Sequence, residues 1–236
     1  HYSIKNMKRD FSMLSDSGVF SDDACKVVEL AFDSIVEAES KVHDIPLDQV
    51  HLHELGSIDT LLDITGVVFA LEVLGAFRKP KEVALIFAPV AVGGGTVKVA
   101  HGNLPVPAPA TSEILEKFGI EFFYGPEDRE LATPTGVALL GALKQLGLAS
   151  QGRPTRPFSI VQKGTGIGSL RLEHRPNMLQ SVLGEYKSTD NSTMQVSSAL
   201  FDRGDELGFM KSAFEVYLLK TNVDDVRGEL LGNLGD

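Results

Sequence analysis

The feature that most constrains the fold is a helix-like run that is apolar on nearly every side. It extends from about Ile58 to Leu74, follows the turn residue Gly56, and has Ser57 as its expected N-cap. A helix that is hydrophobic all round is buried among other elements. Further helices or a sheet must therefore surround this segment, and a chain of 236 residues is long enough to provide them.

Helix-like and strand-like segments occur on both sides of this run. Helices are expected at about 4–14, 22–43, 110–118 and 134–146, and strands at 83–92, 96–100, 121–124, 158–162, 178–184 and 214–219. Gly93, Gly94 and Gly95 favour a turn between the paired strands 83–92 and 96–100. The run from Lys163 to Gly168 favours a flexible hairpin connection. This mixture predicts an α+β fold, a mixed β-sheet with helices packed on it.

A polar, Ser-rich stretch without periodicity follows Lys187 and predicts a linker or loop. We therefore expect an N-terminal α+β domain at 1–186, a linker at 187–213 and the beginning of a C-terminal α+β domain at 214–236. The chain has no initiator Met, and both ends fall in helix-like sequence. We expect it to be part of a longer protein.

Charge and cysteine content narrow the classes of function. With 32 acidic and 22 basic residues the formal net charge is −10, which argues against nucleic acid or a membrane surface as partner. No segment resembles a membrane span or a signal peptide. A single cysteine, Cys25, excludes an internal disulfide and a thiolate cluster, so a reducing, cytoplasmic location is expected.

The stretch from Val50 to Asp59 concentrates metal-binding side chains. His51 and His53 share one side of an extended strand, Glu54 follows, and His101 ends a later predicted strand. Imidazole and carboxylate suit nickel, zinc, iron and copper. The pattern predicts a metal site, although two polar residues on the solvent side of an edge strand would look the same.

Two acids lie one helical turn apart in the apolar run. The helix dipole explains Asp59, which is in the first turn. Asp63 lies deeper, and a buried carboxylate there needs a His, an Arg or a metal as partner.

A second candidate site is the segment Thr133-Pro134-Thr135-Gly136. Thr133 suits an N-cap and Pro134 the first helical turn, so the free N–H groups there are able to bind an anion. An ordinary capped helix is the alternative.

Several motifs in one order resemble a known family. They are HLHELGSIDTLLDITG, APVAVGGGTVKVAHGNLPVPAPAT, ELATPTG, GTGIG and TNVDD, and the resemblance covers about residues 20–186 and 215–232. The order and spacing are similar to those of the nickel-insertion protein of lactate racemase maturation, a nickel chelatase of the lyase class.

The resemblance implies a reaction and its participants. Ni(II) enters a pyridinium bisthiocarboxylate mononucleotide through two nickel–sulfur bonds and one nickel–carbon bond. CTP is hydrolysed to CMP and pyrophosphate, with Mn(II) or Mg(II) on the nucleotide. Lactate racemase apoprotein is the implied recipient, and a homo-oligomer is expected.

The resemblance also implies a role for each candidate residue. His51, His53 and His101 are expected to hold the metal. Nickel–carbon bonding displaces a ring proton, and the candidate bases for it are the carboxylates of Asp63 and Glu54, with His101 as a further alternative. Thr133, Thr135 and Gly136 would bind the substrate phosphate.

Two departures from the family limit this expectation. The glycine-rich N-terminal opening and the body of the CTP-binding C-terminal domain are absent, so we expect the chain to be inactive alone. The rival readings are a zinc-dependent hydrolase that activates water with the same cluster, and a non-enzymatic carrier of nickel or nucleotide.

Overall fold

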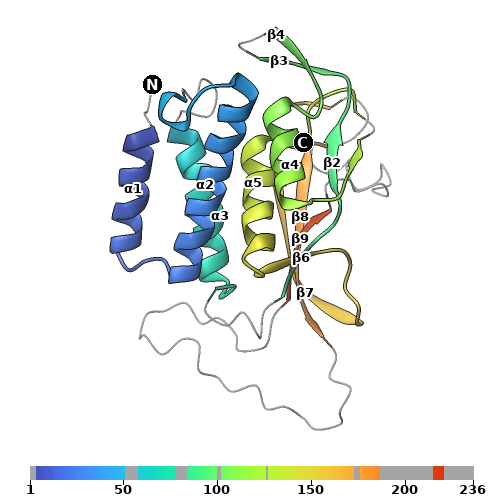
Figure 1. Ribbon diagram of the computed structural model, residues 1–236. Coiled ribbons are helices and arrows are strands. Elements are labelled where there is room, and N and C mark those ends of the chain that lie inside the picture. The colour runs from blue at the N-terminus through green and yellow to red at the C-terminus, as the bar shows by residue number, and fades with distance from the viewer. Residues whose placement is uncertain are drawn as a thin grey trace.

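A computed structural model describes residues 4–50, 58–77, 84–99, 102–125, 127–172 and 176–186, and the backbone of 215–220. The helices stand together on one side of the molecule, and the strands lie next to them (Figure 1). The described strands form a mixed sheet of five strands and two small sheets of two. The predicted α+β class is therefore confirmed.

The predicted helices are all present, with ends within a few residues of those expected. They are α1 (Ile4–Asp16), α2 (Asp22–His43), α3 (Ile58–Val73), α4 (Pro109–Phe118) and α5 (Pro134–Gln145), with a short 3-10 helix η1 (Leu47–Gln49). Local capping explains their limits. The Ser21 side chain accepts a hydrogen bond from the Ala24 N–H, and Asp44 ends α2 in a left-handed conformation. None of the helices in the described residues is long and apolar enough to cross a bilayer.

Hydrogen bonds between helix ends fix the direction of each helix. The Glu72 carboxylate near the end of α3 is buried and accepts hydrogen bonds from the backbone N–H (3.0 Å) and the hydroxyl (2.7 Å) of Ser21 at the start of α2. At the end of α5, the Lys144 Nζ donates to the carbonyls of Phe118 and Gly119, which end α4. Thus α3 runs antiparallel to α2, and α4 runs parallel to α5.

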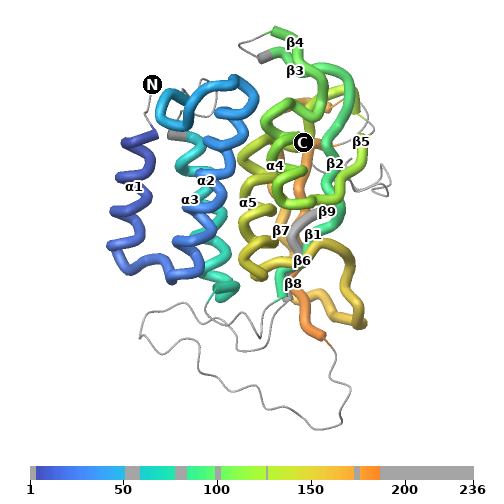
Figure 2. Tube along the Cα trace, in the orientation of Figure 1, coloured from blue at the N-terminus to red at the C-terminus, as the bar shows by residue number. Residues whose placement is uncertain are grey.

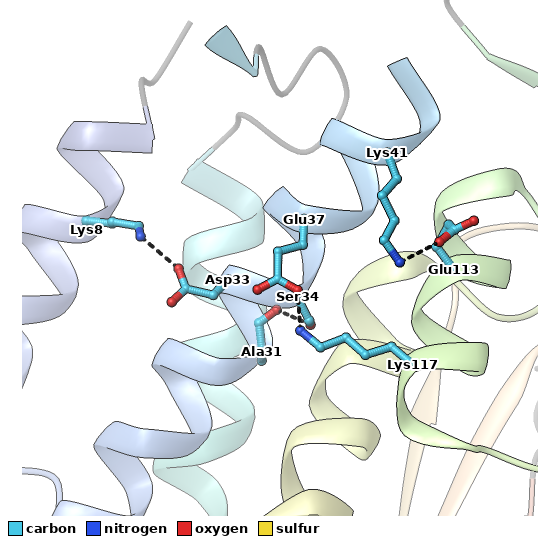
Figure 3. Close-up of polar contacts among 8 residues, drawn as sticks. All are labelled: Lys8, Ala31, Asp33, Ser34, Glu37, Lys41, Glu113 and Lys117. Atoms are coloured by element: carbon cyan, nitrogen blue, oxygen red, sulfur yellow. Dashed lines mark hydrogen bonds and ion pairs between the residues drawn. The ribbon is translucent and has the colours of Figure 1, made fainter. Parts of the chain in front are cut away.

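Ion pairs join α2 to its neighbours in the same sense (Figure 3). Along α2 and α4, Lys41 pairs with Glu113 (3.1 Å) and Glu37 with Lys117 (2.6 Å), an antiparallel match. Helices α3, α4 and α5 therefore begin at one end of the molecule, which we call the helix-start end. It is the upper end in Figure 1.

The main sheet has the strand order β6-β1-β9-β8-β7. Its strands are β1 (Leu85–Phe87), β6 (Ala149–Gln151), β7 (Phe158–Ile167), β8 (Met178–Tyr186) and β9 (Glu215–Lys220). β1 is parallel to β6 and β9, whereas β8 is antiparallel to both β7 and β9. The backbone of β9 thus lies between β1 and β8, and the predicted domain limits at 186 and 214 stay a prediction.

The glycines at 93–95 do not form the turn of a strand pair, so that prediction is wrong. β2 (Val90–Gly93) pairs in parallel with β5 (Phe122–Tyr124), and β3 (Thr96–Val99) pairs with β4 (Gly102–Pro105). The reason is that Gly93 packs against the backbone of a distant segment, at Arg129. Gly93 has a φ of +90°, and a Cβ there would lie 1.7 Å from the Arg129 carbonyl oxygen.

The glycine-rich run at 163–168 is also not the predicted flexible connection. β7 continues through it to Ile167, with Gly164 opposite Ser181 and Gly166 opposite Leu179. Cross-strand hydrogen bonding to β8 keeps these glycines extended, and the chain reverses after Ile167, before β8 begins at Met178.

The core joins helices and strands, but α3 is not enclosed on all sides. Its inner face is buried, including Ile64 and Val68, which pack with Phe32 and Phe87 among the core residues. Its outer face exposes large apolar side chains: Leu62 is 59% exposed, and Phe69 and Val73 are exposed too. The predicted all-round burial is wrong because, among the described elements, α3 packs mainly on α2 and α5.

Candidate functional site

The predicted metal ligands fall outside the described residues. His51, His53 and Glu54 belong to the undescribed stretch 51–57, between Val50 and α3, and His101 belongs to 100–101, between β3 and β4. Within the ranges that the structure describes, no group of three or more His, Cys, Asp or Glu side chains is placed to hold a metal ion. The metal role of the three histidines stays a prediction.

Asp59 and Asp63 of α3 are both exposed to solvent. The expectation that Asp63 is buried in an apolar helix is wrong, because Asp63 lies on the outer face of α3 and that face is uncovered in the described structure. Asp59 and Asp63 both lie toward the helix-start end. A carboxylate in this position needs no buried partner, so the argument for a metal or cation beside Asp63 now depends on the undescribed histidines alone.

Helix α5 begins with the expected cap. The Thr133 hydroxyl oxygen accepts a hydrogen bond from the Gly136 N–H at 3.3 Å, and Pro134 occupies the first turn. Thr133 and Gly136 are exposed, and the Thr135 side chain is buried. The cap uses one donor and Pro134 has none, so the Thr135 N–H is the principal donor left in this turn for an anion.

The elements that adjoin these predicted residues share the helix-start end. The start of α3, the β3–β4 hairpin and the start of α5 all lie there (Figures 1 and 2). The parallel strands β2 and β5 also end toward it. Helix N-termini carry partial positive charge, and ligands of parallel sheets bind beyond the carboxyl ends of the strands. The fold therefore brings together the elements on which the predicted site depends.

The segment 129–131 is hydrogen-bonded to the carboxyl end of β2, a contact that the sequence did not predict. The Gly94 N–H donates to the Arg129 carbonyl (3.3 Å), and the Leu131 N–H donates to the Val92 carbonyl (3.0 Å). This segment leads directly to Thr133. The glycines therefore connect the end of β2 to the start of α5, which places backbone from two predicted motifs in direct contact.

Sequence reasoning also overlooked a group of aromatic side chains on β5. Phe122, Phe123 and Tyr124 are consecutive, and all three are exposed. The signal was present as three successive aromatic residues in a strand of three, where alternation would ordinarily bury one face.

The pKa of Lys26 is shifted, but this residue is remote from the helix-start end. The hydrogen bond and charge of the Asp23 carboxylate raise the pKa of Lys26 above its ordinary value. Both residues lie at the start of α2, which is the opposite end of the molecule from the start of α3. The titration of Lys26 is therefore not part of the candidate site.

Comparison with known proteins agrees with the resemblance of the motifs. Residues 3–236 match the family described as "Nickel insertion protein". A relative from Methanothermobacter thermautotrophicus, which bears the provisional name of a nickel insertion protein, is 39% identical over 213 residues, 90% of this chain and 44% of the relative. A relative from Acetivibrio thermocellus is named "Pyridinium-3,5-bisthiocarboxylic acid mononucleotide nickel insertion protein". It is 30% identical over 232 residues, 98% of this chain and 49% of the relative.

The α+β fold, with helix starts and strand ends gathered at one end, is an architecture suited to an anionic ligand. The family match identifies the chain more closely: it belongs to the nickel insertion protein family. It spans about half the length of the curated relatives it matches. No solved structure matches it.

Proposed function

We propose that the protein inserts Ni(II) into pyridinium-3,5-bisthiocarboxylic acid mononucleotide in a CTP-dependent reaction. The observation that carries the proposal is the family match over 3–236, together with the relative whose name specifies this mononucleotide. The gathering of helix starts at one end supports it, because the substrate carries a phosphate. As this chain spans half of its relatives, the complete reaction is proposed for the full-length protein.

The chemistry requires a metal-holding group and a base. Nickel forms bonds to the two thiocarboxylate sulfurs and to one ring carbon, and that carbon loses its proton. In the proposal, imidazole nitrogens bind nickel and present it to the substrate; they belong to His51, His53 and His101. Three such ligands leave further coordination positions of the nickel open for the substrate. Asp63 or Glu54 accepts the ring proton, and the exposure of Asp63 leaves its carboxylate accessible to a bound substrate.

The start of α5 is the proposed position of the substrate phosphate. The Thr135 N–H and the helix dipole favour an anion, and Thr133 and Gly136 are exposed beside it. Local backbone N–H groups are able to hold a small anion despite the net negative charge of the chain.

The proposal also includes the hydrolysis of CTP. Hydrolysis to CMP and pyrophosphate, with Mn(II) or Mg(II) on the nucleotide, is assigned to a C-terminal domain that begins near Thr221 to Asp225, outside the described residues. We further propose lyase-type chemistry, a cytoplasmic location, lactate racemase apoprotein as recipient and inactivity of this chain alone.

Calorimetric titration with Ni(II) tests the metal assignment. The His51→Ala/His53→Ala double variant is expected to bind nickel at least about tenfold more weakly, since each imidazole contributes a bond to the metal. His43→Ala is the matched control, because the His43 Nε2 already pairs with the Glu39 carboxylate at 3.3 Å. Equal nickel affinity of the double variant and the unmodified chain would remove these histidines from the proposal. Zinc-dependent hydrolysis of simple esters or phosphate esters, without a nickel product, would favour a hydrolase instead.

A further inference from the structure

Strand β5 exposes an unusual amount of aromatic surface. Phe122 is 43% exposed, Phe123 44% and Tyr124 67%. Aromatic side chains ordinarily contribute their large apolar area to a core or an interface. Successive strand residues point to opposite faces, so Phe122 and Tyr124 share one face and Phe123 lies on the other.

The rings of Phe122 and Tyr124 form an edge-to-face pair. Their centroids are 6.0 Å apart and their planes meet at 75°. A third flat ring that stacks on one member of such a pair presents its edge or face to the other member. We call these two exposed rings, set at an angle to each other, the aromatic corner; a third flat ring is able to pack against them in preferred aromatic geometry.

This aromatic corner lies at the helix-start end. Tyr124 is paired with Gly93 at the carboxyl end of the parallel β2–β5 pair. Gly93 is also bridged to Glu130, on the segment that leads to the start of α5. Carboxyl ends of parallel strands are where ligands of such sheets bind. A ring held by Phe122 and Tyr124 would thus lie on the same end of the molecule as the proposed phosphate position.

We propose that Phe122 and Tyr124 bind the pyridinium ring of the mononucleotide substrate by stacking. The inference rests on the proposed function, which supplies a substrate with a planar, positively charged ring. A cation is attracted to the negative face of an aromatic ring, and a flat ring gains dispersion energy there as well. Stacking would hold the ring while nickel approaches its carbon, and neither aromatic side chain takes part in proton transfer.

The test uses nicotinamide mononucleotide, a pyridinium mononucleotide without sulfur, as the probe in calorimetric titration. The Phe122→Leu/Tyr124→Leu variant is expected to bind it about 5- to 30-fold more weakly than the unmodified protein. Phe123→Leu is the matched control, since Phe123 is as exposed as Phe122 but lies on the other face of the strand. The control should change binding by less than about twofold, and Tyr124→Phe should restore most of the affinity.

Two further probes separate this inference from the proposed function. Ribose 5-phosphate, which has no aromatic ring, should bind the double variant and the unmodified protein equally. The reduced, uncharged dihydropyridine mononucleotide should bind the unmodified protein more weakly than the pyridinium form. Equal binding of the pyridinium probe to the double variant and the unmodified protein would overturn the stacking inference and leave nickel insertion standing. No binding of any ring-bearing mononucleotide to the unmodified protein would overturn the substrate assignment and the inference together.

A measurement on the unmodified protein covers the case of a variant that does not fold. The chain has four Tyr and no Trp, so NMR of ring-labelled tyrosine gives few signals. The Tyr124 ring protons, assigned by Tyr124→Phe, should shift upfield on addition of the pyridinium probe. Unshifted Tyr124 signals at saturating probe would overturn the inference.

Discussion

At the scale of single residues, the glycines at 93–95 show how one sequence pattern can serve a different structural purpose. Three glycines between apolar runs predict a turn, because glycine tolerates left-handed backbone. Gly93 does have a φ of +90°, yet its essential property is the missing Cβ, which allows the Arg129 backbone to approach. Nothing in the local sequence specifies that neighbour, because the contact joins segments far apart in the chain.

This close approach predicts the effect of a small substitution. Gly93→Ala should destabilise the fold by about 2–4 kcal/mol, through steric conflict with the Arg129 carbonyl and an unfavourable φ. Gly166→Ala is the control, because no atom lies within 4 Å of the position of its Cβ and its φ is ordinary. It should change stability by less than about 1 kcal/mol. Urea denaturation measures both, and equal destabilisation would contradict the packing described for Gly93.

At the scale of elements, helices were predicted more completely than strand pairings. Capping residues such as Ser21 and Thr133, and the apolar periodicity of α2, are local signals, so the five helices could be placed from sequence. Pairing of β1 with β6, or of β2 with β5, joins strands that are separated along the chain by several other elements. Most strands were predicted, but β4 and β6 were missed. The distant partners were not predicted, because a local pattern does not encode register with a distant strand.

Helix α3 illustrates the same limit for burial. Composition predicts an apolar helix but not how many neighbours surround it. The structure predicts that Ile64→Ala, at a fully buried site, lowers the free energy of unfolding by about 2–5 kcal/mol. Leu62→Ala, on the exposed face, should lower it by less than about 1 kcal/mol. Chemical denaturation of the two variants tests this, and a loss at Leu62 as large as at Ile64 would show that the outer face of α3 is covered in solution.

At the scale of the whole molecule, the fold brings elements that adjoin scattered motifs to one end of the protein. Antiparallel α2–α3 and α2–α4 packing, with α4 parallel to α5, brings three helix starts to one end. The sequence predicted the anion-binding motif at Thr133 and the histidine cluster but could not show that their elements share this end. The exposed aromatic pair on β5 was missed, since exposure follows from tertiary packing rather than from residue type.

The central claim is that this protein inserts nickel into the pyridinium mononucleotide. The most direct measurement is mass spectrometry of that mononucleotide after incubation with Ni(II), CTP and this chain completed with the remaining half of the Acetivibrio thermocellus relative. The intact relative serves as the positive control. We expect a nickel-containing mononucleotide that has lost its ring proton, formed together with CMP and pyrophosphate, and much less of it when His51 and His53 are replaced by alanine. A substrate recovered without nickel, while the intact relative converts it, would contradict the proposed nickel insertion.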